Sequence, residues 1–97
     1  MAKTRGDDRS FVLAVDNKVG SVCGLHFVCR EERTGEVFEA IEIGEGSDPE
    51  IVGDYLYAWM MTYKPAGVSK TLVAIAMRRG IPLPGVLPVL DMTRRCG

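Results

Sequence analysis

The stretch SVCGLHFVCR, residues 21–30, decides the fold. Its side chains alternate in the way that those of a half-buried β-strand do. Cys23, Leu25, Phe27 and Cys29 face one side of that strand, and Val22, Gly24, His26 and Val28 face the other. A strand of this kind needs neighbours to pair with, so the sequence predicts a sheet built outward from these residues.

Both flanking segments read as strands. SFVLAVD, residues 10–16, is a short apolar run rich in β formers, and Asn17–Gly20 reads as the turn that follows it. On the other side, residues 32–35 form a hairpin loop that ends in Gly35. EVFEAIEI, residues 36–43, then returns as a third strand, although a helix would also group its apolar side chains. The sequence therefore predicts a three-stranded antiparallel meander.

A long amphipathic helix follows the predicted sheet. Asp48 is placed to cap it with Pro49 at the first helical position, or Ser47 caps it together with Glu50. The helix should end before Pro65, because the residue before a proline avoids the α conformation. One wide apolar face is expected to hold Ile51, Val52, Tyr55, Leu56, Trp59, Met60 and Tyr63.

A shorter second helix is predicted over Lys70–Arg79, with Ser69 as its cap and Gly80 as its stop. A strand over 71–77 is the alternative, because this segment contains β-branched residues. The tail holds Pro82, Pro84 and Pro88, which exclude a regular helix. Its apolar residues should lie extended over the protein or over a second subunit.

These elements define a small α+β protein. Residues 1–9 are expected to form a flexible arm, and residues 10–97 a single domain. No apolar run approaches the roughly 18 residues of a membrane span, and the polar N-terminus holds no secretion segment. The three cysteines, Cys23, Cys29 and Cys96, are an odd number, which argues against a closed disulfide framework. Cys23 and Cys29 are predicted to be reduced core thiols in a cytoplasmic protein.

The charges are unevenly distributed although the net charge is only −1. The acids of the middle segment are Glu36, Glu39, Glu42, Glu45, Asp48, Glu50 and Asp54. The bases that follow are Lys64, Lys70, Arg78, Arg79, Arg94 and Arg95. The acidic group predicts a surface for a protein partner, and the basic group is the set that would contact nucleic acid.

The segment AGVSK, residues 66–70, resembles the turn of the helix-turn-helix in the lactose-repressor family of regulators. That resemblance implies a helix-turn-helix-like segment over 66–80, in which the helix after the turn would read DNA. The exposed positions of such a helix would include Ala74 and Ile75, which cannot read base edges by hydrogen bonding. Nucleic-acid binding is therefore an alternative rather than the leading hypothesis.

Three antiparallel strands followed by a helix resemble the beginning of the ribonuclease H-like fold. The resemblance implies a metal-binding aspartate on the first strand, and Asp16 ends that strand. The chain looks too short for the remaining strands, and neither Asp54 nor Asp91 is marked by its spacing as a partner ligand. Asp16 also suits a turn, so a metal-dependent nuclease-like enzyme is the second alternative.

No other catalytic or cofactor pattern is present. His26, the only histidine, faces the side of its strand opposite the cysteines, so no Cys–His pair forms within the strand. One histidine and three scattered cysteines do not predict a zinc site, and Gly44–Gly46 lacks the spacing of a phosphate loop. We expect no catalytic residue, no metal and no cofactor.

The apolar surplus is the most informative feature. The first strand is apolar on both faces, whereas one helical layer covers only one face. Tyr57 and Met61 on the long helix, and Leu83 and Leu87 in the tail, are candidates for an apolar interface. The sequence predicts a non-catalytic, dimeric protein that acts by binding another protein, such as an inhibitor or regulator encoded by a mobile element or phage.

Overall fold

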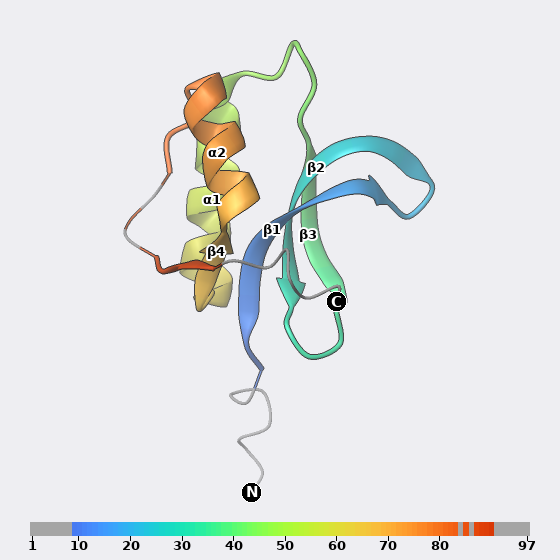
Figure 1. Cartoon of the computed structure of the whole chain (residues 1–97), viewed down its shortest axis with the longest axis vertical. Coiled ribbons are helices and arrows are strands. Elements are labelled where there is room, and N and C mark those ends of the chain that lie inside the picture. Colours follow the sequence, from blue (N-terminus) through green and yellow to red (C-terminus); the bar gives the residue numbers. More distant parts are fainter. Residues whose placement is uncertain (1–8, 84, 86, 91–97) are drawn as a thin grey trace, which may run out of the picture.

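A computed structural model describes residues 9–83, 85 and 87–90 of the chain. Two α-helices lie on the same side of a mixed β-sheet (Figure 1). The strands are β1 (Phe11–Val19), β2 (Val22–Glu31), β3 (Val37–Glu42), β4 (Gly67–Ser69) and β5 (Val89–Leu90). The helices are α1 (Pro49–Tyr63) and α2 (Lys70–Arg79). The α+β class predicted from the sequence is confirmed.

The sheet has five strands in the order β3-β2-β1-β4-β5, so the prediction of three strands is incomplete. β1, β2 and β3 form the antiparallel meander, and β4 and β5 extend the sheet in parallel from β1. The expectation that the chain is too short for further strands is therefore wrong. The added strands are only three and two residues long, which is why alternation did not reveal them.

The β1–β2 hairpin is longer than the sequence predicts. Residues 17–19 do not turn but continue β1, and the turn is made at Gly20 and Ser21. Pairing shifts register between Asp16 and Lys18, which marks a β-bulge at Asn17. Gly20 has φ +61°, a conformation that glycine adopts without strain. The far end of this hairpin extends away from the helices (Figure 1).

Helix α1 begins and ends as the sequence predicts. The Asp48 side chain accepts a hydrogen bond from the Glu50 backbone N–H, and Pro49 occupies the first turn. The Ser47 capping box is therefore not used. Lys64, in the left-handed region, ends the helix before Pro65.

The buried face of α1 is narrower than predicted. Val52, Leu56 and Trp59 are buried against the sheet, whereas Ile51 and Tyr55 are about half exposed. Gly53 also belongs to the buried face, because a Cβ at this position would lie 2.7 Å from Cγ of Pro82. The apolar residues of α1 therefore exceed what the sheet covers.

The segment between the two helices is a strand rather than the turn of a helix-turn-helix. β4 pairs with β1 and with β5, and all three of its residues are buried. Gly67 lets β4 and β5 approach each other closely, since a Cβ at this position would lie 2.6 Å from Cδ1 of Leu90. The Ser69 hydroxyl then caps α2 by accepting from the Leu72 N–H at 3.1 Å. The resemblance of residues 66–80 to a DNA-reading unit is thus not reflected in the fold.

Helix α2 is confirmed over Lys70–Arg79, with Gly80 as its left-handed stop. The strand alternative for 71–77 is wrong, because Ser69 and Gly80 fix both ends of a helix whose inner stripe is buried. After it, Ile81 is buried, and Leu83 and Leu87 pack against the core of this same chain. The described part of the tail therefore covers its own domain.

The two cysteines of β2 differ in environment. Cys29 is fully buried beneath the helices, as predicted, but Cys23 is exposed near the hairpin end. The prediction of two core thiols is wrong for Cys23, because the hairpin extends beyond the helical layer. Cys96 and most of the predicted arm at 1–9 lie outside the described residues.

Candidate functional site

The face of the sheet opposite the helices carries a cavity of about 500 Å³ lined by both apolar and polar side chains. Its floor is formed by apolar side chains of β1, and its polar lining is Asp16, Asn17, Arg30, Glu32, Ser69 and Thr71. These residues come from β1, from β2 and the loop after it, and from the junction of β4 with α2. Segments distant in sequence thus meet around one concave surface.

The cavity includes the middle of β1 and the carboxyl end of β4, two neighbouring parallel strands. β1 leads to β2 on one side of the sheet, whereas β4 leads through α2 to β5 on the other. A point where the chain leaves neighbouring parallel strands in opposite directions is a common place for ligand binding in open sheets. The topology therefore makes this cavity a candidate site.

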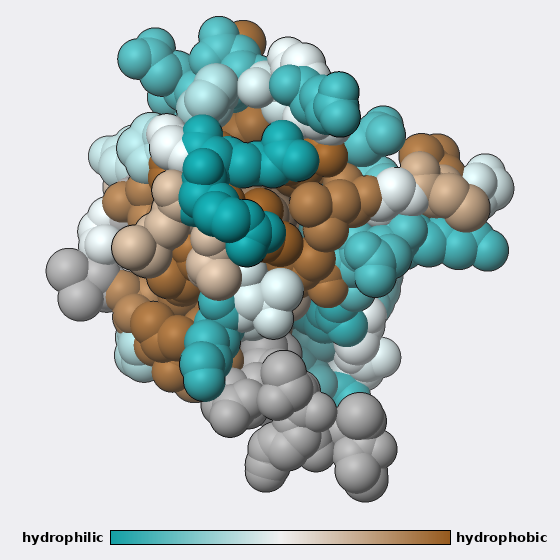
Figure 2. Space-filling view, turned by 45° about the horizontal axis from the view of Figure 1, so that its top comes forward, coloured by the Kyte–Doolittle hydropathy of each residue, from teal (hydrophilic) through white to brown (hydrophobic). Residues whose placement is uncertain are grey.

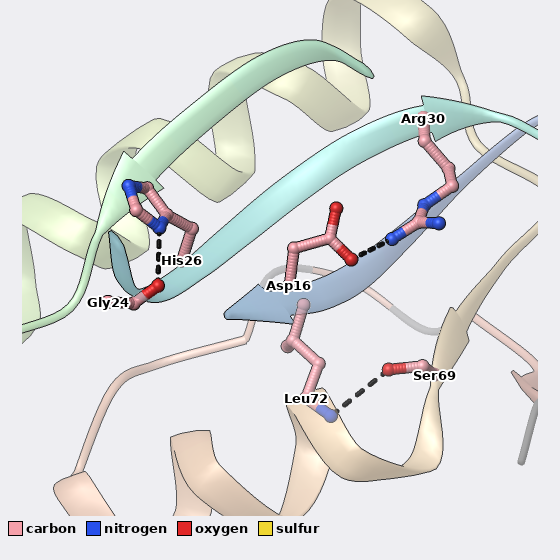
Figure 3. A network of polar contacts seen from close by, with 6 residues as sticks. All are labelled: Asp16, Gly24, His26, Arg30, Ser69 and Leu72. Atoms are coloured by element: carbon pink, nitrogen blue, oxygen red, sulfur yellow. Dashed lines mark hydrogen bonds and ion pairs between the residues drawn. The ribbon is translucent and has the colours of Figure 1, made fainter. Parts of the chain in front are cut away.

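Two of the charged lining groups already bind each other. The Arg30 guanidinium pairs with the Asp16 carboxylate across β1 and β2 (Figure 3). About a quarter of each side chain is exposed. Nε of Arg30 is buried and has no hydrogen-bond partner among the described residues. The pair neutralises Asp16, which opposes direct use of that carboxylate as a metal ligand.

His26 lies beside this pair on β2. It is 5% exposed, and its Nδ1 donates to the Gly24 carbonyl oxygen at 2.7 Å (Figure 3). In the strand register His26 stands between Asp16 and Glu42. Cys29 belongs to the opposite face of the sheet, so the two do not form a nucleophilic pair.

The described residues hold no group of three His, Cys, Asp or Glu side chains arranged to bind a metal ion. Asp54 is exposed on α1, on the other side of the sheet from Asp16. Asp91, the other carboxylate considered with Asp16, lies outside the described residues. Within the described part of the chain, Asp16 therefore has Arg30 rather than carboxylates as its partner.

The outward face of α1 is a second candidate site. Of the seven large hydrophobic side chains exposed in the described part of the chain, four lie on this helix. They are Ile51 (52% exposed), Tyr55 (49%), Tyr57 (57%) and Met61 (60%). Sequence reasoning identified Tyr57 and Met61 but assigned Ile51 and Tyr55 to the core. Only the position of the sheet distinguishes those two from Val52 and Leu56.

Apolar surface elsewhere is more scattered. Figure 2 shows brown apolar areas interrupted by hydrophilic side chains, and a projecting arm at the right that carries both kinds. Val22 at the hairpin end, Met77 on α2 and Val89 on β5 are exposed, one from each element. Because these three residues lie on different elements, α1 is the element on which exposed apolar side chains are concentrated.

The acidic residues do not form one surface. Glu39 and Glu42 lie on opposite faces of β3 according to the strand register. Glu39 accepts a hydrogen bond from Tyr63 at 2.7 Å, and Asp48 serves as the helix cap. Glu36, Glu45, Glu50 and Asp54 are exposed. The seven acids are therefore divided between structural roles and separate surfaces.

Lys64, Lys70, Arg78 and Arg79 are all exposed, and Arg79 donates to the Gly44 carbonyl oxygen at 2.8 Å. Lys70 and Arg78 occupy opposite ends of α2, and Lys64 lies at the end of α1. Arg94 and Arg95 lie outside the described residues. The four described bases thus belong to three separate helix ends.

Comparison with known proteins gives no relative: no family model, curated protein or solved structure matches the chain. Within the described residues, neither helix has the length and apolar character required to cross a membrane.

Proposed function

We propose that this protein is a non-catalytic binding protein that acts by contacting another protein through the outward face of α1. The observation that carries the proposal is the group Ile51, Tyr55, Tyr57 and Met61, each about half exposed on one helix. The fold does not need these groups to be apolar, because the sheet is covered by other residues of α1.

The residue types support a binding role. Tyrosine and methionine are enriched in the centres of protein interfaces, where they supply apolar contact at a modest cost in conformational entropy. The rigid layer below them, with Leu56 and Trp59 buried, holds the helix in place. An inhibitor or regulator of this size would act by occupying the surface of its target. Its unpaired Cys23 and Cys29 fit the reducing cytoplasm.

Site-specific photo-crosslinking in cells of the source organism tests the proposal. A photoreactive phenylalanine analogue in place of Tyr57 should give discrete protein adducts. The same analogue at Thr34, which is exposed in the β2–β3 loop, is the control and should give far fewer. Equal, diffuse labelling from both positions would contradict a binding role for α1.

A metal-dependent nuclease-like enzyme is the second candidate, because the sheet does continue beyond the meander and Asp16 lines the cavity. Mg²⁺ or Mn²⁺ binding measured by calorimetry, lost in Asp16→Asn, would support it. In this candidate Arg30 must release Asp16, so Arg30→Gln should bind the metal more tightly than the natural protein. No measurable binding in either protein would remove the candidate.

A further inference from the structure

Four exposed residues of α1 form one stripe along the helix, Glu50, Asp54, Tyr57 and Met61, and the exposed Lys64 follows them as the left-handed C-cap. Their spacing alternates between four and three residues, which places the four helical residues on one side of α1, with the apolar Tyr57 and Met61 in its second half. Together with Lys64 the stripe runs about 21 Å, since a helix rises about 1.5 Å per residue. It is a surface of the right form to contact another helix.

The charges of the stripe are separated along its length. Glu50 and Asp54 lie one turn apart in the first half, and Lys64 lies at the other end. The one ion pair found within the described residues joins Asp16 and Arg30, so none of these three charges is paired there. The two carboxylates repel each other weakly across one turn, and a cation placed between them would relieve that repulsion.

We propose that the partner of this stripe is the same stripe of a second copy, antiparallel to the first and related to it by a two-fold axis at Tyr57. This inference rests on the proposed function, because it names the partner of Tyr57 and Met61, two of the four residues of the proposed binding surface. Glu50 and Lys64 are equally distant in sequence from Tyr57. Each Lys64 ammonium then meets the Glu50 carboxylate of the other copy, and the two Tyr57 rings pack together at the axis.

The antiparallel orientation follows from the charges. A parallel pair would place Glu50 against Glu50 and Lys64 against Lys64. An antiparallel pair turns both repulsions into attractions and opposes the two helix dipoles favourably. One helix pair buries less than the roughly 800 Å² per partner of a standard stable interface, so we expect a dissociation constant in the micromolar range, about 1–100 μM.

Sedimentation equilibrium of the purified full-length chain tests this geometry. Glu50→Lys and Lys64→Glu should each weaken the dimer about ten-fold, because each replaces two attractive contacts by two repulsive ones. An equimolar mixture of the two variants should recover the natural affinity, since every contact in the mixed dimer again joins opposite charges. Glu36→Lys changes the net charge equally outside the stripe and should leave the affinity unchanged.

Three results would overturn the proposal. A natural chain that stays monomeric up to about 1 mM would exclude a dimer in the range expected from interface size. A Glu50→Lys chain that pairs better with the natural chain than either does with itself would indicate a parallel pair. A dimer unaffected by either reversal and by Tyr57→Glu would place the interface elsewhere.

The same data separate this proposal from the broader one. A monomer whose Tyr57 crosslinks give adducts of another mass would leave the binding function standing and remove the second copy as partner. A monomer that also gives no specific adduct would remove both. Circular dichroism of each variant shows whether α1 remains folded, and Tyr57→Glu provides a second test of the stripe if Glu50→Lys does not fold.

Discussion

Both faces of α1 carry large apolar side chains, but only those of the inward face are covered by the rest of the chain. The inward face buries Val52, Leu56 and Trp59 against the sheet, and Gly53 allows close contact with Pro82. The outward face presents four large apolar side chains that are about half exposed. The first set is explained by the packing of this chain alone. The second set is not, which is why we assign it to binding.

The largest expected effect is a difference in the free energy of unfolding between substitutions on the inward and on the outward face of α1. Leu56→Ala should lower the free energy of unfolding by about 3 kcal/mol, because it leaves a cavity at a fully buried position. The neighbouring Tyr57→Ala should change it by less than about 0.5 kcal/mol. Urea unfolding at a protein concentration well below the dimer dissociation constant measures both. Comparable losses would show that the outward face belongs to the folding core.

The next largest change in stability is expected where α1 contacts Pro82 of the tail. Gly53→Ala should destabilise the protein by about 1–2 kcal/mol, since the added methyl group meets Pro82 on both its ring and its backbone oxygen. The gain in helix propensity, about 1 kcal/mol, offsets only part of this loss. Gly46→Ala, at a position with open space, is the control and should be nearly neutral. A stabilised Gly53→Ala protein would mean that Pro82 does not pack there.

Alkaline pH tests the burial of Cys29, which lies on β2 beneath the helices. Burial, and then the nearby Glu39 carboxylate, raise the pKa of Cys29 from 9.0 to about 12. Below pH 9 the thiol is protonated in both states, and as pH rises toward 12 only the unfolded chain gains by ionising. The folded state should therefore lose about 1 kcal/mol by pH 10 through this group. Cys29→Ala should show a smaller decline, and parallel pH curves for the two proteins would contradict the prediction.

The smallest expected effect on stability is also the most informative one about function. Tyr57→Ser combined with Met61→Ser should alter the free energy of unfolding of the monomer by less than about 0.5 kcal/mol. The same double variant should lose most of its crosslinking or association, because it removes the centre of the proposed surface. Val22→Ser, exposed on the hairpin, should affect neither. Loss of association in the Val22 variant alone would move the site to the hairpin.

Much of the fold was predictable from local patterns. Alternation predicted β2, and its neighbours followed from turn residues. Both helices were given by their caps, Asp48 and Ser69, and by their ends before Pro65 and at Gly80. β4 and β5 were missed because they are short and pair in parallel with strands distant in sequence. Such pairing leaves no periodic signal in the chain.

The candidate site was predicted only in part. Tyr57 and Met61 stood out because they fall on the side of the helix away from its apolar stripe, but Ile51 and Tyr55 did not. Which apolar side chains of a wide stripe face the sheet depends on how the helix is set against it, and sequence spacing alone does not give that angle. Cys23 was misplaced for a related reason, since the extent of the helical layer over the hairpin is a tertiary property.

The most direct test of the binding surface is to compare the oxidation rates of two exposed methionines, one on the proposed surface and one outside it. Met61 on the outward face of α1 and Met77 on α2 are 60% and 74% exposed, so both should react with dilute peroxide at similar rates in the isolated monomer. In cells of the source organism we expect Met61 to react at least five-fold more slowly than Met77, since only Met61 is covered by a partner. Equal rates for the two methionines in cells would contradict the assignment of α1 as the binding surface.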